Sequence, residues 1–550
     1  MTIDEATRKF IDSLKQTCGS FGLGNDGNEY KIIIQVFLYK YFNDKFGYEA
    51  KRTSRFGERL RKAERWDQEY DTFTEDEMLD LFDYLPAGTP RLRPQHTISH
   101  LYNAQGQSDI STLFDATLID IADLNADVFS VVTDSGSKLT IFEGVANLLS
   151  DTKKRDQFVR SLLRYIADPD ANFESIFEEK YDFFSTMFEH LIKDYNKDGG
   201  GKYAEYYTPR SIALIMARLL VGEATDLRNI ECYDPSAGTG TLLMALAHTI
   251  GEDRCTMFSQ DVSQKSSLML RLNLILNNLP SSIQNVVQGN TLLNPAHKNN
   301  DGTLKKFDYI VSNPPFKLDF PDIRDTIAKD TVRFWAGVPK KPTKIDPDKP
   351  KMEIYTCFIQ HMINSLKDGK GKGAIVVPTG FLASKNGIEK NILKKIVDEE
   401  IVYGCVSMPS NVFATTGTNV SILFIDKQKE HKDVILIDAS HLGEEYKDGN
   451  NQRTRLRDYE IDLIVNTFLN KETIEDFSII TSFKKIKDKG YSLTPSQFFD
   501  VKVKYQELTK VEYKEMVSSL SEKIKADLLI NQELSSKIIS ALSQVKYEED

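Results

Sequence analysis

A short polar and aromatic stretch, Ser312-Asn313-Pro314-Pro315-Phe316, is the part of the sequence best suited to chemistry on a planar ligand. The apolar run before it is typical of a buried strand, and the two prolines then hold the backbone extended. The Asn313 side chain offers a carbonyl acceptor and an amide donor, while Phe316 offers a flat face for stacking. At the carboxyl end of a strand, where open α/β sheets bind ligands, these groups suit a planar ring with an exocyclic amine. Taken alone, the stretch fits a proline-rich turn better, and only the upstream sequence reverses that preference.

A glycine-containing loop lies upstream, after a run at 230–234 that predicts another strand. The loop 234–241 reads Asp-Pro-Ser-Ala-Gly-Thr-Gly-Thr and opens a helix, so its backbone can approach a ligand at a helix N-terminus. The next predicted strand ends in Asp261, about 20 residues beyond the glycines, where nucleotide-binding βαβ units place the acid that binds ribose hydroxyls. A helix-capping aspartate is the alternative. The loop lacks the third glycine of a dinucleotide fingerprint and a Walker lysine, which favours a small nucleoside cofactor over NAD or ATP.

The elements that must position these groups follow from the spacing of apolar residues. Strands are predicted at 230–234, 256–261, 307–311, 373–378, 402–408, 420–426 and 434–437, with helices at 242–250, 267–279 and 355–366. This alternation is typical of an α/β fold with a mainly parallel sheet covered on both faces. A polar insertion at 321–352 follows the Asn-Pro-Pro-Phe stretch directly, and a mobile loop over the site is expected there.

The flanking regions are predicted to be helical. Residues 1 to about 145 carry apolar residues at three- and four-residue spacing, most densely at 30–39. The tail after about 505 carries a loose apolar stripe suited to a partner helix or, equally, to its own chain. We therefore predict a helical N-terminal domain at 1–150, a catalytic domain at 151–480 and a helical C-terminal tail for partner contact at 481–550.

Composition limits the classes of function. No apolar run is long enough to span a membrane and the N-terminus lacks a signal peptide, so a cytoplasmic protein is expected. The five scattered cysteines argue against zinc or a disulfide framework. A net charge of -11 means that any basic DNA-binding surface is either local or supplied by another subunit. The charges at 52–69 are interpreted as a solvated helix face in preference to a DNA-facing surface, because acids balance the bases.

Together, the two motifs and their order resemble the S-adenosylmethionine-dependent adenine-N6 DNA methyltransferases. The segment 204–210, Ala-Glu-Tyr-Tyr-Thr-Pro-Arg, resembles that family's Tyr-Thr-Pro-Arg element, which lines the methionine end of the cofactor. The resemblance implies a Rossmann-like methyltransferase domain that transfers a methyl group to N6 of a flipped-out adenine, with no metal ligands. The implied catalytic residues are Asn313, Pro314, Pro315 and Phe316. The implied S-adenosylmethionine-binding residues are Glu205, Tyr206, Tyr207, Thr208, Pro209, Arg210, Asp234, Ser236, Gly238, Thr239, Gly240, Thr241, Asp261 and Asn290.

The resemblance extends to the modification (M) subunits of type I restriction–modification systems. Segments 333–339, 358–378 and 411–425 and the helical ends of the chain resemble that subunit. The implied partners are double-stranded DNA, a DNA-specificity (S) subunit, a second M subunit and a restriction/translocase (R) subunit. One departure is Asn290, where the family commonly has aspartate near the cofactor's adenine. The alternatives are a stand-alone adenine methyltransferase, a methyltransferase acting on glutamine amides and a non-catalytic scaffold; Phe316 and the helical extensions favour DNA over glutamine.

Overall fold

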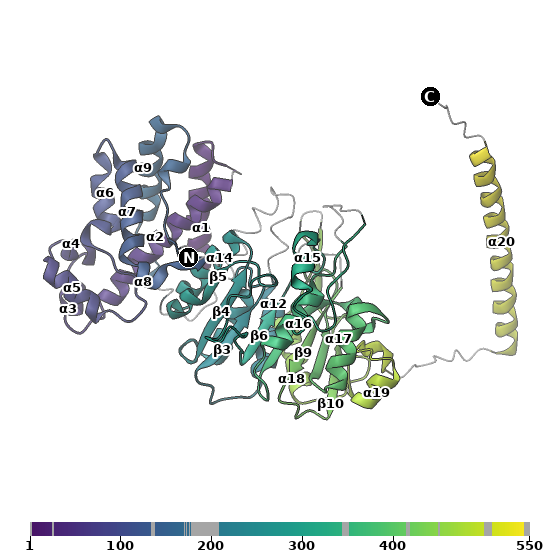
Figure 1. Cartoon of the computed structure of the whole chain (residues 1–550). Coiled ribbons are helices and arrows are strands. Elements are labelled where there is room, and N and C mark those ends of the chain that lie inside the picture. The colour runs from purple at the N-terminus through teal and green to yellow at the C-terminus, as the bar shows by residue number, and fades with distance from the viewer. Residues whose placement is uncertain are drawn as a thin grey trace. The chain divides into compact units, whose positions relative to one another are not determined.

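We describe a computed structural model of the chain. It describes residues 3–24, 27–133, 138–169, 171, 173–174, 177, 208–343, 351–413, 419–448, 451–499 and 509–543. The chain forms two compact units, residues 1–498 and 499–550 (Figure 1). The further division of the first unit into a helical and a catalytic domain stays a prediction.

An eleven-stranded sheet is the centre of the first unit, counted over the described residues (Figure 1). Its order is β13-β10-β8-β9-β7-β6-β3-β4-β5-β1-β2. The strands are β1 Val131–Thr133, β2 Lys138–Leu139, β3 Ile230–Asp234, β4 Cys255–Asp261, β5 Val286–Gln288, β6 Tyr309–Ser312, β7 Lys372–Pro378, β8 Val402–Ser407, β9 Val420–Asp426, β10 Asp433–Asp438 and β13 Ser478–Ser482. The run β7-β6-β3-β4-β5 is parallel throughout, whereas β9 pairs antiparallel with both β7 and β8.

Helices cover both faces of this sheet because its central strands are apolar on both sides. In β7, Ala374 and Val376 belong to one buried cluster, while Ile375 and Val377 belong to another. The first cluster contains residues of α12 Arg210–Val221, α13 Thr241–Ile250, α14 Gln264–Leu276 and α18 Asp458–Leu469. The second contains residues of α16 Tyr355–Ser365, α17 Gly387–Asp398 and α19 Phe483–Asp488. The predicted α/β fold is confirmed.

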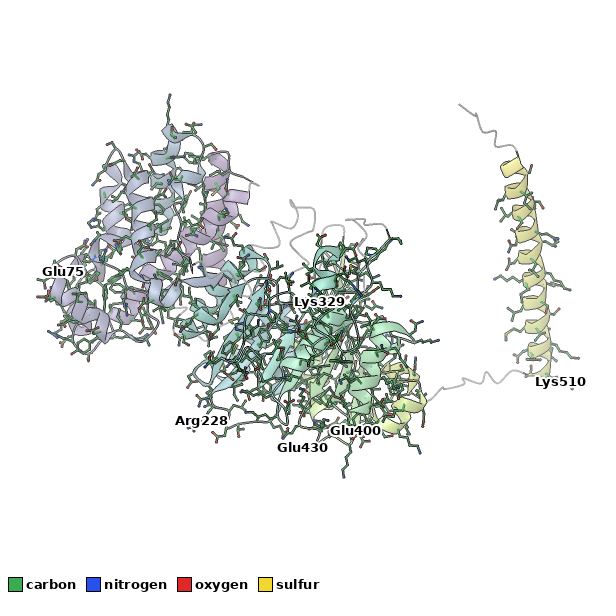
Figure 2. The ribbon with its side chains drawn as sticks, viewed as in Figure 1. Glu75, Arg228, Lys329, Glu400, Glu430 and Lys510 are labelled. Carbon is green, nitrogen blue, oxygen red and sulfur yellow. The ribbon has the colours of Figure 1, made fainter. Side chains whose placement is uncertain are left out.

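The strands begin along one side of the sheet, and the parallel strands of the site end along the opposite side. Arg228, Glu400 and Glu430 precede β3, β8 and β10, and Figure 2 shows them together along the side of the sheet where these strands begin. Lys329, in the segment that follows β6, lies toward the other side in the same view (Figure 2). The parallel strands β3, β4, β5 and β6 end at this second side, where ligands bind in open α/β sheets.

Several short strands were not predicted. β5 has three residues, and β1 and β2 come from the region predicted to be helical, where β1 pairs in parallel with β5. The hairpin of β11 Glu444–Asp448 and β12 Asn451–Arg455 and the edge strand β13 were also missed. Strands this short or this polar carry too few apolar residues to show a period of two.

The N-terminal region is built around α2 Gly27–Ala50, with which α1 Ile3–Ser20 and α9 Arg155–Ile166 pack. The helices α3 Gly57–Lys62, α4 Trp66–Tyr70, α5 Glu75–Tyr84, α6 Ile98–Asn103, α7 Ile110–Leu124 and α8 Ala126–Phe129 complete this region. The predicted core helix at 30–39 is confirmed, since residues 32–39 are all buried. Hydrogen bonds join this region to α14, beside the sheet: Tyr41 Oη donates to Ile275 O, and Arg271 Nη2 donates to Thr140 O.

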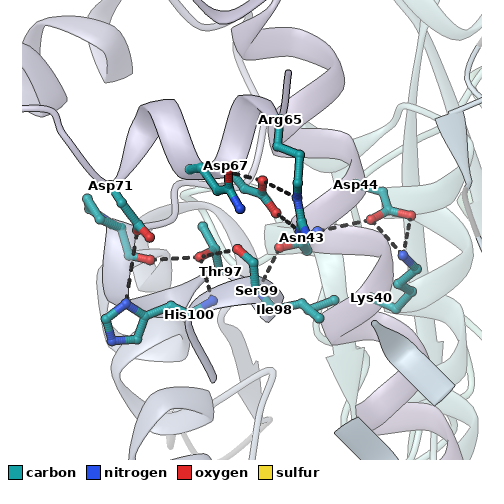
Figure 3. Close-up of polar contacts among 12 residues, drawn as sticks. Lys40, Asn43, Asp44, Arg65, Asp67, Asp71, Thr97, Ile98, Ser99 and His100 are labelled. Carbon is teal, nitrogen blue, oxygen red and sulfur yellow. Dashed lines mark hydrogen bonds and ion pairs between the residues drawn. The ribbon is translucent and has the colours of Figure 1, made fainter. Parts of the chain in front are cut away.

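Charges in the helical region pair with one another. Figure 3 shows Lys40 beside Asp44, with 3.0 Å between Nζ and Oδ2, and Arg65 beside Asp67, with 2.7 Å between Nη2 and Oδ2. Arg59 contacts two glutamates, and Arg55 and Lys62 each contact one acid. These pairs support the interpretation of the charges at 52–69 as a solvated helix face.

The second unit contains one long helix in its described part, α20 Lys510–Ser543. A helix is present where one was predicted after about residue 505, and the apolar side chains of its stripe are exposed, including Leu520, Ile524 and Leu528. Residues 481–498, which the predicted tail included, belong to the first unit. Contact of this helix with a partner stays a prediction. Among the described residues, no helix has the length and apolar character needed to cross a membrane.

Candidate functional site

The two motifs singled out from the sequence lie side by side. β3 ends at Asp234 and its parallel neighbour β6 ends at Ser312, so both turns leave the same edge of the sheet. The hydroxyls of Ser236 and Ser312 are 2.7 Å apart and share a hydrogen bond. The glycine turn and the Asn-Pro-Pro-Phe stretch therefore form the two halves of one site.

The glycine turn has a backbone shape that its glycines permit. Gly238 and Gly240 have φ angles of 51° and 86°, in the left-handed region. A Cβ atom on Gly240 would lie 2.1 Å from Leu270 Cδ1, so α14 packs directly against the turn. Gly240 is the N-cap of α13, whose first amides lie at the same turn. The turn can thus bring main-chain donors close to a ligand.

Asp261, at the end of β4, organises this turn. Its Oδ2 accepts a hydrogen bond from Gly238 N at 2.9 Å, and its Oδ1 accepts one from Ser263 N at 2.8 Å. Ser263, and not Asp261, caps the following helix, so the capping alternative is wrong. Burial raises the pKa of the Asp261 carboxyl above its ordinary range. Each carboxylate oxygen has a second lone pair, which leaves acceptors for a ligand's hydroxyls.

Asp234 is a buried carboxyl beside the turn, with 1% of its surface exposed. Its Oδ1 accepts a hydrogen bond from Ser236 N at 2.9 Å. Burial, with a smaller contribution from the charge of Asp261, raises the pKa of Asp234 to about 8. Among the described residues, the one charged group that contributes to this shift is Asp261, which carries a like charge. Such a carboxyl suits a ligand with a positive charge.

The loop after β5 completes this half of the site. Thr291 Oγ1 donates to Pro235 O at 2.7 Å, and Gly289 N donates to Asp261 O at 2.8 Å. Asn290 Oδ1 accepts hydrogen bonds from the backbone N–H groups of residues 292 and 293, both at 3.1 Å. An aspartate would accept the same two bonds, so asparagine at this position changes the charge of the loop and preserves its turn.

The other half of the site is organised by Asn313, which is half-buried. Its Nδ2 donates a hydrogen bond to Thr208 Oγ1 at 3.0 Å, and Thr208 is 6% exposed. Thr208 directly precedes Pro209, the N-cap of α12. The amide nitrogen of Asn313 thus contacts a residue of the Tyr-Thr-Pro-Arg element, and the hydrogen bond holds the carboxamide at that residue.

Phe316 is half-buried and is held by a second aromatic ring. Its ring contacts that of Tyr355 edge-on, with centroids 6.3 Å apart and an interplanar angle of 79°. The Tyr355 hydroxyl donates to Glu389 Oε1, which fixes the tyrosine ring. Neither Tyr355 nor the pairing of Thr208 with Asn313 was predicted, because the contacting residues are far apart in the chain.

The remaining predicted residues fall into three groups. Ser236, Thr239, Thr241, Pro209, Pro314 and Pro315 lie at the turns described above, and Arg210 is exposed at the start of α12. Glu205, Tyr206 and Tyr207 lie outside the described residues, as do residues 344–350 of the insertion. His361, in α16, is a core residue: it is 1% exposed, and its Nε2 lies 3.2 Å from Tyr233 Oη. The described residues contain no cluster of His, Cys, Asp and Glu suited to a metal ion.

The chain matches a known protein family. The family model described as N-6 DNA Methylase matches residues 179–507, more than half of the chain. The chain therefore belongs to the N-6 DNA methylase family.

Its relatives include subunits of restriction enzymes. The chain is 28% identical over 384 residues to the type I restriction enzyme MpnII methylase subunit of Mycoplasma pneumoniae, covering 68% of this chain and 64% of the relative, just under two thirds. It is 24% identical to the HindI methylase subunit of Haemophilus influenzae, covering 78% of this chain and 93% of the relative. The type I restriction-modification methyltransferase subunit from Streptococcus thermophilus shares the fold, with a TM-score of 0.68 and 21% identity over 90% of this chain and 99% of that one.

Proposed function

We propose that this chain transfers the methyl group of S-adenosylmethionine to the N6 atom of an adenine flipped out of duplex DNA. The observation that carries the proposal is the hydrogen bond from Asn313 to Thr208, beside the glycine turn. Because the amide nitrogen donates to that hydroxyl, the side-chain oxygen of Asn313 is the end of the carboxamide turned to a target amine.

In this mechanism, Asn313 Oδ1 and the Pro314 carbonyl accept hydrogen bonds from the two N–H groups of the target amine. These bonds draw the nitrogen lone pair out of conjugation with the ring and aim it at the methyl group. Phe316 stacks on the extruded base, and its contact with Tyr355 keeps the ring in place. Transfer is then a direct displacement: the bond from N6 to the methyl carbon forms as the methyl–sulfur bond breaks, S-adenosylhomocysteine leaves, and the methylated amine loses one proton to solvent. Positioning and electrostatics accelerate this step, and no covalent nucleophile is required.

The residues of the glycine half fit S-adenosylmethionine, which supplies a sulfonium methyl group when bound. The turn at Gly238 and Gly240 admits the backbone close to a nucleoside, and Asp261 has lone pairs for ribose hydroxyls. The buried Asp234 carboxyl matches a cationic ligand group. The proposed cofactor set also includes Glu205, Tyr206, Tyr207, Thr208, Pro209, Arg210, Ser236, Thr239, Thr241 and Asn290.

We further infer that the chain acts in the cytoplasm as the modification subunit of a type I complex. Its proposed partners are double-stranded DNA, a specificity subunit, a second modification subunit and a restriction subunit. Membership of the family and the names of the relatives support this role. The net charge of -11 supports it too, because a protein that grips phosphates alone needs a basic surface.

The test is methyl transfer to DNA by the purified chain, with and without its specificity subunit. Radiolabel from S-adenosylmethionine should enter duplex DNA only when the specificity subunit is present, and mass spectrometry should identify N6-methyladenine. Methylation by the single chain would establish the stand-alone enzyme instead. A chain that binds no S-adenosylmethionine would contradict the proposal.

A further inference from the structure

Arg333 is a buried cation that joins the cofactor half of the site to the segment that follows the Asn-Pro-Pro-Phe stretch in the chain. It lies in the segment 317–343, which follows the Asn-Pro-Pro-Phe stretch, and its side chain is 5% exposed. Its Nη1 donates to Thr291 O at 3.2 Å, and its Nη2 donates to Leu292 O. Its Nε lies 3.0 Å from Asp330 Oδ2, so a carboxylate balances the guanidinium charge.

The two carbonyls that Arg333 contacts belong to the loop beside the glycine turn. Thr291 is buried and its hydroxyl donates to Pro235 O, within the turn. Gly289, in the same loop, donates to the backbone of Asp261. A movement of the loop would therefore also displace the glycine turn, Asp261 and Asn290.

Arg333 is itself held firmly. Asn364 Nδ2 donates to Arg333 O at 3.0 Å, and Arg333 N donates to Asp330 Oδ1 at 3.0 Å. The guanidinium also lies over the ring of Phe334, 4.5 Å from its centroid. A planar group with several fixed donors can hold two neighbouring carbonyls at once, which a lysine ammonium does less well.

We propose that Arg333 is a positioning residue for the cofactor loop 289–293. It ties that loop to the segment that follows the Asn-Pro-Pro-Phe stretch in the chain, so that the shape of the cofactor site depends on a residue outside the catalytic and cofactor-binding sets. The inference rests on the proposed function and adds a residue outside its catalytic and cofactor-binding sets. Its consequence is that substitution of Arg333 weakens cofactor binding while the chemical step at saturating cofactor stays near wild type.

Arg324 offers a matched control in the same segment. Its Nε donates to Pro339 O at 3.1 Å and its Nη2 to Val338 O at 3.2 Å, so it also holds two backbone carbonyls. Those carbonyls lie within its own segment and not in the cofactor loop. R324M therefore removes the same kind of contact without releasing loop 289–293.

The experiment compares R333M, R333K and R324M in the full chain with its specificity subunit. S-adenosylmethionine affinity is measured by calorimetry, unfolding temperature without cofactor by scanning fluorimetry, and kcat at saturating cofactor by label transfer. We expect R333M to raise the Kd about tenfold, R333K to recover part of that loss, and R324M to leave the Kd unchanged. We expect kcat to change by less than about threefold in each variant.

A purely structural role would lower the unfolding temperature of R333M while its Kd stayed equal to that of R324M, and this result would overturn the inference. If R333M is insoluble, R333K decides: a wild-type Kd in R333K overturns the inference as well. Failure of the wild-type chain to bind S-adenosylmethionine would instead count against the proposed function.

Discussion

The two halves of the site are built in different ways. In the glycine half, side chains bind the main chain: Asp261 accepts two main-chain N–H groups, Thr291 donates to the Pro235 carbonyl, and Leu270 packs against Gly240. In the target half, side chains bind one another, through the contacts of Asn313 with Thr208 and of Phe316 with Tyr355. Contacts to the main chain hold the shape of the turn itself, whereas contacts between side chains can be removed while the backbone stays in place. Substitutions in the target half should therefore change catalysis without changing the stability of the fold, whereas substitutions in the glycine half should change both.

The largest effect is expected from Asn313→Ala. This change removes the proposed acceptor of the target amine and leaves the glycine half untouched, so kcat should fall by at least about a thousandfold. The Kd for S-adenosylmethionine should stay within about twofold of wild type, as measured by calorimetry. Wild-type methylation of adenine by this variant would remove the catalytic assignment of Asn313.

Gly240→Ala should disturb folding and binding together. The new Cβ meets Leu270 in a left-handed backbone, so the free energy of unfolding should fall by about 3 kcal/mol and cofactor affinity by about a hundredfold. Gly387→Ala is the matched control, since Gly387 has a φ of 73° and open space around its Cβ position. It should lose only about 1 kcal/mol and keep its cofactor affinity, as denaturant titration and calorimetry will show. Equal losses in the two variants would mean that the contact with Leu270 is unimportant.

Asp234→Asn should weaken cofactor binding and stabilise the free protein. The folded pKa of about 8 lies above the ordinary value of 3.8, so the folded state holds an extra proton between these limits and loses stability as pH rises through them. The asparagine variant lacks this loss and should be more stable than the wild type at about pH 8.

The same linkage predicts how cofactor binding depends on pH. A cationic ligand favours the carboxylate, so wild-type affinity should rise with pH, by up to about tenfold per unit, and level off above about 8. Calorimetry across this range should find a much flatter profile in the Asp234→Asn variant. A flat wild-type profile would show that Asp234 does not face a charged group of the cofactor.

Thr208→Val should give the smallest effect and the sharpest test of the target half. Valine keeps the shape of threonine but gives Asn313 Nδ2 no acceptor, so the carboxamide loses its preferred orientation and kcat should fall about fivefold to tenfold. Thr208→Ser keeps the hydroxyl and should retain most of the activity. If only the KM for S-adenosylmethionine rises, with kcat unchanged, Thr208 serves cofactor binding and not the orientation of Asn313.

The limits of β3 and β9 follow from the sequence. β9 is buried along its whole length, and β3 is buried over its last three residues. β5 does not follow from the sequence because it has three residues, and β1 and β2 do not because their pairing with the sheet depends on a chain segment about 150 residues away. A short strand forms because neighbouring strands pair with it, so its own residues give little indication that it is a strand.

The candidate site shows the same division. The residue types, their order and the strand before each motif follow from the sequence, because a glycine turn and an Asn-Pro-Pro-Phe stretch have local backbone requirements. The partners of those residues do not: Thr208 lies 105 positions from Asn313, and Arg333 lies 42 positions from the carbonyl that it contacts in Thr291. The sequence by itself determined which groups are available for chemistry. Only the tertiary structure decided how they are oriented and held, because a hydrogen bond between distant residues exists only once the sheet has brought its strand ends to one edge.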